Sequence, residues 1–443
     1  MNRSITRAPD LSRRRVALAG LLAILLLSFI GDNSLSVYSN ADSGDALRQV
    51  GVTLVCVMLL AFTHVRHGWR HTSALPVSLL VVFVYCLMSS TWALAPFISL
   101  RRLASTVMVA WAVFRAAGEL GPVATLQTLR NVAMALIVAS YLVLIFTTAG
   151  THHSFDDFAD LIGNWRGIFV HKNVAGEFLG MAIVMFVFDP VPTPRLMRYG
   201  FLLAAVVFLW ESHSKTVIGV IGLALAVGWL MRTYNPRHLS RAALIVLVGC
   251  AVALPVASVY SGRLIAVIED PTGFSGRSAI WQYMWIYAQS HLWTGAGYGS
   301  FWQIGRDSPI LRLSSDWVAD AGHGHNGYLD LLVTVGAPGL VMAVLAAFVW
   351  PTVLLLIDDA MPAAQRAWCA ATLVFIFCDN MTETSLLDRA AVLEVVLMLT
   401  LAVIHRSAER DGRRPGAYAA LGLGFMAPHA GSARRRPLFR IRP

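Results

Sequence analysis

The sequence predicts an all-α membrane protein that crosses the bilayer about twelve times. Its 443 residues are 57% hydrophobic and only 14% charged, whereas a soluble domain carries about 25% charged residues. Apolar stretches long enough for a spanning helix, roughly 20 residues each, recur along the chain. The period-2 alternation of membrane-spanning strands is absent. These observations exclude a soluble enzyme and indicate a bundle of helices.

Twelve apolar segments are the predicted spans. They lie at residues 16–31, 49–65, 75–95, 102–116, 129–149, 173–189, 199–212, 215–231, 242–259, 326–356, 367–380 and 390–405. Residues 1–405 thus form the predicted membrane domain, and most connections within it are short. Residues 406–443 hold nine arginines among glycine, proline and alanine, which predicts a disordered tail on the anionic cytoplasmic leaflet.

The net charge of +10 is unevenly distributed along the chain. With the N-terminus inside, most of the 35 lysines and arginines fall in the inner segments and the C-terminal tail. An excess of these residues marks the cytoplasmic side of a membrane, so both termini are predicted to be cytoplasmic. Arg13-Arg14-Arg15 precedes the first apolar run without a clear cleavage site after it, which favours an uncleaved anchor. The charge therefore indicates orientation in a membrane and no nucleic-acid partner.

The segment 260–325 is the largest predicted external loop. It is rich in tryptophan and glycine, and loops of this length are usually functional or disordered; this composition favours order. Within it, residues 276–291 have the pattern of an amphipathic helix that carries Arg277, Trp281 and Trp285 at i, i+4 spacing. The tryptophans are expected either to lie at the membrane interface or, as for Trp281, to stack on sugar rings.

Cations are scarce on the predicted outer face. Arg166 and Lys172 lie in the outer segment 150–172, and Arg277 opens the amphipathic helix. Together with His325 they would suit a diphosphate, because guanidinium groups bind phosphate oxygens in pairs and stay charged. The alternative is that each arginine pairs with a nearby acid. The candidate acids are Asp156, Asp157, Asp160, Glu269 and Asp270.

His325 and Asn326 stand where the external loop meets a long apolar helix. A helix N-terminus disfavours imidazolium and helps to keep the ring neutral and able to accept a proton. Asp330 follows Asn326 by four residues and is expected to hydrogen-bond its side chain. The alternative is that His325 only caps the helix.

His323 and His325 also form an H-x-H pair, which raises the question of a metal. Neither a cysteine nor a carboxylate stands at ligand spacing, and Asp320 is a weak third ligand. We therefore predict no metal site. The pair Asp379 and Glu383, one helical turn apart, either assists proton transfer or solvates a helix end; solvation is the interpretation we favour.

Three segments resemble the superfamily of O-antigen ligases and Wzy-type polysaccharide polymerases. The first is His325-Asn326, nine residues, then Gly336-Ala337-Pro338-Gly339, directly after the large loop. The second is SGRSAIW, residues 275–281, followed by GAGYGSFW. The third is NWRGIFVHKNVAG, residues 164–176, which is similar to the version in succinoglycan-type exopolysaccharide polymerases.

The resemblance implies a GT-C-like membrane glycosyltransferase of the bacterial inner membrane with a periplasmic active site. It would transfer a glycan from a polyprenyl-diphosphate carrier with inversion, without a metal or other cofactor. Arg166 and Arg277 would neutralise the departing diphosphate, and His325 would orient or deprotonate the acceptor hydroxyl. His171, Lys172, Asn173, Asn326 and Trp281 are the expected substrate-binding residues.

The Arg-Gly-Ile-Phe-Val-His-Lys-Asn run favours a polymerase, which would join lipid-linked repeat units into exopolysaccharide or O-antigen. The alternative is a ligase that transfers the glycan to lipid A-core. A chain-length regulator and a flippase of the same pathway are the expected protein partners. A polysaccharide or lipid transporter is the competing class. A transporter should line its interior with intramembrane charge, whereas the candidate residues here gather at one face.

Overall fold

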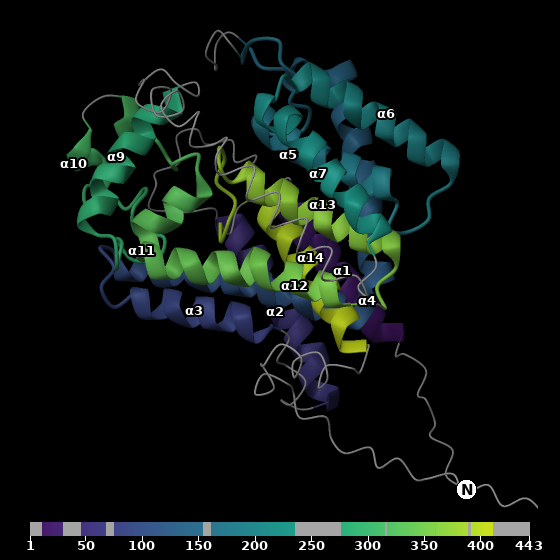
Figure 1. The fold of residues 1–443 in the computed structure, drawn as a ribbon, viewed down its shortest axis with the longest axis horizontal. Coiled ribbons are helices and arrows are strands. Elements are labelled where there is room, and N and C mark those ends of the chain that lie inside the picture. Colours follow the sequence, from purple (N-terminus) through teal and green to yellow (C-terminus); the bar gives the residue numbers. More distant parts are fainter. Residues whose placement is uncertain are drawn as a thin grey trace, which may run out of the picture.

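The computed structural model describes residues 11–29, 46–67, 75–153, 161–234, 276–314, 317–358, 360–388 and 391–410. It is 79% helical, and the described residues contain no strands. The helices from the N-terminal half are α1 (Leu11–Phe29), α2 (Ala46–His67), α3 (Val77–Ser89), α4 (Pro96–Phe146), α5 (Lys172–Phe188), α6 (Arg195–Ser212) and α7 (Lys215–Thr233). Those that follow are α9 (Arg277–Ser290), α10 (Pro309–Leu313), α11 (Gly327–Val344), α12 (Trp350–Ile357), α13 (Ala363–Asp379) and α14 (Val392–Arg410). The prediction of an all-α membrane protein is confirmed (Figure 1).

Most predicted spans coincide with helices, and the differences are local. Three described helical segments are long and apolar enough to cross a membrane by length and composition: Pro96–Phe146, Lys215–Thr233 and Gly327–Ile357. The predicted span 242–259 lies outside the described residues, so the number twelve and the GT-C-like arrangement stay predictions. The basic tail was predicted to begin at residue 406, but α14 remains helical to Arg410.

α4 combines two predicted spans. Gly121, at φ 77°, interrupts the helix, and Pro122 follows it. Near one end, Arg102 donates hydrogen bonds to the carbonyls of Gly299 and Trp302 in the external loop. Beyond the other end, Gly150 accepts from the segment that leads to α5. One end of α4 therefore contacts the segment after α9 and the other the segment before α5, so the break at Gly121 marks the far side of the bundle.

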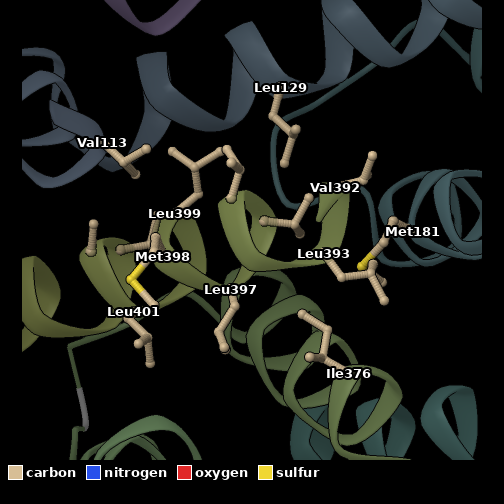
Figure 2. Packing of buried hydrophobic residues seen from close by; sticks show 14 of the residues in the cluster. Val113, Leu129, Met181, Ile376, Val392, Leu393, Leu397, Met398, Leu399 and Leu401 are labelled. Carbon is tan, nitrogen blue, oxygen red and sulfur yellow. The ribbon is translucent and has the colours of Figure 1, made fainter. Parts of the chain in front are cut away.

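α14 is the centre of the apolar core. Its residues from Val392 to Ile404 are almost all buried, including Leu393, Leu397 and Leu401 at zero exposure. Figure 2 shows these side chains between Val113 and Leu129 of α4, Met181 of α5 and Ile376 of α13. A helix that is apolar on every face is stable only inside a bundle. The buried α14 therefore fixes the position of the loop before it, residues 380–388, relative to the surrounding helices.

A break in α11 docks the external loop onto the bundle. Gly336 adopts φ 68° inside the helix, and Pro338 follows, so Val333 and Val335 lose helical partners for their carbonyls. Ala296 N donates to the Val333 carbonyl at 2.8 Å, and Tyr85 Oη donates to the Val335 carbonyl at 3.2 Å. A Cβ on Gly336 would lie 2.6 Å from the backbone of Trp293. The Gly-x-x-Gly motif thus serves backbone packing.

The described residues of the predicted external loop, 276–314 and 317–325, pack around a second small core, to which α11 contributes Leu332 and Val333. Trp281 and Met284 of α9, Phe301, Trp302 and Ile310 are buried there together. Arg102 of α4 fixes the glycine-rich segment by donating to the carbonyls of Gly299, Trp302 and Gln303 at 2.5, 2.8 and 3.1 Å. The predicted helix at residues 276–291 and the ordered character of the described part of this loop are confirmed.

Candidate active site

Glu383, in the loop between α13 and α14, joins three segments that are far apart in the sequence. Its Oε1 accepts hydrogen bonds from Nη2 of Arg277 at 2.6 Å and from Nδ2 of Asn173 at 2.7 Å. Its Oε2 lies 3.0 Å from Nδ1 of His325. The Glu383 side chain is only 8% exposed. One buried carboxylate therefore contacts the first residue of α9, the second residue of α5 and the residue before the cap of α11.

The charge of Glu383 decides which nitrogen of His325 donates the hydrogen bond between them. Burial alone would raise the pKa of Glu383, but the hydrogen bond from His325 and the charge of Arg277 outweigh it and lower that pKa. The group is therefore a carboxylate at neutral pH, and Nδ1 of His325 must be the donor of the hydrogen bond. When the ring is neutral, Nε2 carries the lone pair, and no described residue hydrogen-bonds it. The side chain is 30% exposed, so a neutral ring can accept a proton from a bound molecule there.

Arg277 is positioned at an electrostatically unfavourable place. It is the first residue of α9, after Gly276 at φ 88°, and a cation at a helix N-terminus opposes the helix dipole. Its guanidinium donates to Glu383 and to the carbonyl of Thr382. The described residues thus use two of its five N–H groups, and its side chain is 16% exposed. The remaining donors can bind an anion beside His325.

Asn326, rather than His325, is the cap of α11. Its Oδ1 accepts hydrogen bonds from the backbone nitrogens of Tyr328 and Leu329, and its Nδ2 donates to the Met381 carbonyl at 3.1 Å. His325 precedes the cap and has φ 47°. Residues other than glycine rarely adopt this backbone conformation outside strained functional sites. The interpretation of His325 as a helix cap is therefore wrong.

Asp330 stabilises the backbone of the loop that carries His325. The expected hydrogen bond to the Asn326 side chain is not formed. Instead its carboxylate accepts from Gly324 N at 3.1 and 3.2 Å, from Nε1 of Trp302 at 2.6 Å and from the hydroxyl of Thr384. Asp330 lies inside α11, so its oxygens point back past the cap to the two loops. It fixes the backbone just before His325.

The run at residues 166–173, which leads into α5, places Asn173 in contact with Glu383. His171 is the cap of α5, and its Nδ1 accepts from Asn173 N at 3.2 Å. Burial and the neighbouring His152, whose ring lies 5.1 Å away, lower the pKa of His171 to about 4, so the ring is neutral. His152 Nε2 accepts from Lys172 N at 3.1 Å. These contacts orient Asn173 toward Glu383.

Arg166 lies in the same run but apart from the Glu383 contacts. Its Nε donates to the Ala149 carbonyl at 3.1 Å and its Nη1 to the Val170 carbonyl at 3.2 Å. Arg166 therefore stabilises its own loop, and in the described part of the chain no hydrogen bond or ion pair joins it to Arg277 or His325. Of the four cations expected to converge, Arg277 and His325 both contact Glu383, whereas Arg166 donates to carbonyls of its own loop.

Trp281 is buried at 8% exposure, and its Nε1 donates to the Gly324 carbonyl at 2.8 Å. In this position it supports the loop that carries His325 rather than presenting its face outward. Trp285, one turn later on α9, is 50% exposed. The acids Asp156, Asp157, Asp160, Glu269 and Asp270 lie outside the described residues, and the carboxylate that pairs with Arg277 is Glu383.

The structure corrects the interpretation of Glu383 as a residue that solvates a helix end. The sequence offered a signal, an acidic residue one turn beyond the end of an apolar helix, but gave no partner for it. Glu383 also stands near His323 and His325, and single ligand atoms of the three lie within 4.8 Å of one another. Spacing along the chain could not reveal this third potential ligand. Glu383 already accepts a hydrogen bond from Arg277, and the positive charge of Arg277 would repel a metal cation bound there.

Residues 199–344 match a family model described as O-antigen ligase. The superfamily resemblance inferred from the motifs is confirmed. The matched region contains Arg277, His325 and the Gly336-x-x-Gly339 motif, whereas Arg166, Asn173 and Glu383 lie outside it. No curated protein matches the sequence significantly. The O-antigen ligase domain and the apolar helices together support a membrane protein with glycan ligase or polymerase activity in general.

Proposed function

We propose that the protein polymerises oligosaccharide repeat units carried on polyprenyl diphosphate. The observation that carries this proposal is the Glu383 carboxylate, which holds Arg277, His325 and Asn173 together. The three come from three motifs of the superfamily resemblance. Asn173 ends the run that favours a polymerase, and its contact with Glu383 links that run to the residues matched by the O-antigen ligase model.

In this proposal His325 and Arg277 have different roles in the reaction. Nε2 of His325 takes the proton of an acceptor hydroxyl while the hydroxyl oxygen forms a bond to the anomeric carbon. The bond from that carbon to the diphosphate oxygen breaks, and its electron pair leaves with the polyprenyl diphosphate. Arg277 stabilises the charge that develops on the departing oxygen, and Arg166 would contribute after its loop reaches the diphosphate. Attack from the face opposite the leaving group inverts the configuration.

In this proposal the site is periplasmic, both termini are cytoplasmic, and neither a metal nor another cofactor takes part. Diphosphate is already a good leaving group, so charge stabilisation is the main requirement. Glu383 has the role of a positioning residue. It would keep the Nδ1 proton of His325 in place and hold the ring in one orientation, as the carboxylate does in a hydrolase triad. Lys172, His171 and Asn326 would orient substrate around these groups.

The test is a strain that lacks the gene, complemented with wild-type, Arg277→Ala or His325→Ala protein at matched expression. Secreted and lipid-linked glycans are then sized. We expect the deletion to leave single repeat units on the carrier and only the wild type to restore long chains. Arg312→Ala is the matched control, because Arg312 is 70% exposed in the same external loop and pairs with Asp307 at 3.1 Å. Normal long chains from both site variants would exclude this proposal.

Ligation to lipid A-core is the second candidate, favoured by the description of the matching family model. It predicts a different product in the same strain: long chains accumulate on the carrier and none reach lipid A-core. His325→Gln separates a base from an orienting group, since glutamine keeps a hydrogen bond but cannot take the proton. Turnover near that of the wild type would rule out the base, and His291→Gln, in the exposed turn after α9, is its control.

A further inference from the structure

The indole of Trp317 lies directly beside the start of α9. A Cβ on Gly276, the residue before Arg277, would lie 3.3 Å from Cη2 and Cζ2 of this ring. Gly276 also has φ 88°, a backbone conformation that favours glycine. Both observations explain why a glycine precedes Arg277, and the first places an aromatic ring next to the residue proposed to stabilise the departing diphosphate.

Much of the Trp317 ring is open. Trp317 is 55% exposed, although tryptophan side chains are highly buried on average. Because the ring meets Gly276 through the edge that carries Cη2 and Cζ2, part of its face stays accessible. Trp281, whose pattern predicted stacking on sugar rings, is by contrast 8% exposed and donates to the Gly324 carbonyl. The accessible indole at the start of α9 is therefore Trp317 rather than Trp281.

The backbone that carries Trp317 is well supported. Trp317 is the first residue of a 3-10 turn, Trp317–Asp320, and the next residue, Val318, is fully buried in the second small core together with Trp281. The Val318 carbonyl accepts a hydrogen bond from Ala321 N at 3.1 Å, and the chain then leads to His325. A ring on such a support is already in position when a ligand arrives, which lowers the entropy cost of binding.

The surroundings of Trp317 are suited to water rather than to lipid. α10 packs against the turn Trp317–Asp320, and its Arg312 pairs with Asp307. These two side chains are 70% and 73% exposed, and exposed charges are costly in hydrocarbon. Tryptophan is also common at membrane interfaces, but the neighbouring charges favour a polar ligand for this ring.

We propose that Trp317 stacks on a sugar ring of the lipid-linked glycan, close to the bond that breaks. A pyranose presents C–H groups on its faces, and these pack on the electron-rich face of an indole. Trp317 would hold the sugar while Arg277, next to Gly276 in the chain, binds the diphosphate. The expected ligand is a pyranoside with one face free of axial hydroxyl groups. This subsite rests on the proposed function, since it serves the same glycan.

The experiment measures binding to the purified full-length protein by native mass spectrometry in detergent. One probe is the polyprenyl-diphosphate-linked glycan extracted from the deletion strain, and the other is polyprenyl diphosphate without a glycan. Every protein carries His325→Ala, so that no glycan is transferred during the measurement. Trp317→Leu keeps apolar bulk but removes the ring. We expect it to weaken binding of the glycan-linked probe about fivefold and to leave binding of the bare carrier unchanged, whereas Trp317→Tyr should retain most of the binding.

Trp293→Leu is the matched control. Trp293 is 71% exposed and lies beyond the other end of α9, about 20 Å from Arg277 at 1.5 Å per residue, so its replacement should change the binding of neither probe. Unchanged binding of the glycan-linked probe by Trp317→Leu would overturn the sugar subsite and leave the proposed function standing. Equal weakening of both probes would show a lipid contact and also overturn the subsite. If the parent protein bound neither probe, the proposed function would fail together with the subsite. Size-exclusion profiles confirm that each variant is folded.

Discussion

At one end of the bundle Glu383 meets Arg277, Asn173 and His325, and at the other end Glu119 meets Arg115 and Arg13. Both are glutamates between helices, and both neutralise an arginine. Glu383, however, has a partner on each oxygen, with three distances between 2.6 and 3.0 Å. Glu119 has one close guanidinium and a second at 4.0 Å. The first arrangement is specified by geometry and the second mainly by charge.

The difference lies in the backbone that supports each cluster. The residues around Glu383 come from four loops or helix starts, and several have unusual conformations: Gly276 and His325 have positive φ, and Gly336 breaks α11. The residues around Glu119 stand on continuous helical surface, where side chains one turn apart meet by regular spacing. Chemistry that depends on proton position needs the first kind of support.

The largest effect is expected from Glu383→Gln. The amide cannot fix His325 by charge, and it leaves Arg277 without its counterion, so turnover should fall roughly 100–1,000-fold. The measurement is the rate of chain growth on a lipid-linked repeat unit by purified protein. Asp307→Asn is the control, because Asp307 is a 73% exposed carboxylate paired with an arginine in the same external loop. A loss below tenfold for Glu383→Gln would contradict the proposed role of the carboxylate.

Gly336→Ala should disturb the support of the Glu383 cluster. The residue would be strained at φ 68° and its Cβ would meet the Trp293 backbone, which we expect to cost about 2–4 kcal/mol. Thermal unfolding in detergent measures this as a lower Tm. Gly222→Ala in α7, where a Cβ meets nothing within 4 Å, should leave the Tm unchanged or slightly raised. Equal Tm values for the two variants would show that the break in α11 is not required.

Arg102→Lys tests how the glycine-rich segment is held. A single ammonium cannot reach the three carbonyls of Gly299, Trp302 and Gln303, and the lost hydrogen bonds should cost about 2 kcal/mol. Hydrogen exchange of residues 297–303 should become faster. The control is Arg195→Lys, at the exposed start of α6. Unchanged exchange in residues 297–303 would show that their packing, rather than Arg102, keeps them in place.

The smallest effect concerns pH and His171. Burial lowers the pKa of this ring from 6.5 to about 4, so between these values the unfolded chain binds a proton that the folded chain does not. Stability should therefore fall as the pH drops from 6.5 toward 4. His171→Asn keeps an acceptor for Asn173 N and removes the titration, so its Tm should decline less over this range. Parallel curves for variant and wild type would argue against a neutral, buried His171.

The helices and the superfamily were accessible from the sequence because they depend on local patterns. Apolar runs predicted most helices, and the amphipathic pattern predicted the helix that begins at Arg277. The motifs selected Arg277, His325 and Asn326 because each keeps its place relative to its own helix start. The 51-residue α4 was predicted as two spans, and Gly121 with Pro122 explains the interruption between them.

The tertiary structure alone decided which acid meets these residues. Glu383 lies 58 residues after His325, 106 after Arg277 and 210 after Asn173, and no pattern in the chain links positions so far apart. The sequence assigned Glu383 to the end of α13 and assigned Asp330 to Asn326, because the nearest neighbour in sequence is the only partner that spacing can offer. Packing of the apolar α14 fixes the position of the loop that carries Glu383 relative to the other helices. The carboxylate then meets partners from α5, α9 and α11 because four chain segments are packed at that point, which is a property of the folded bundle.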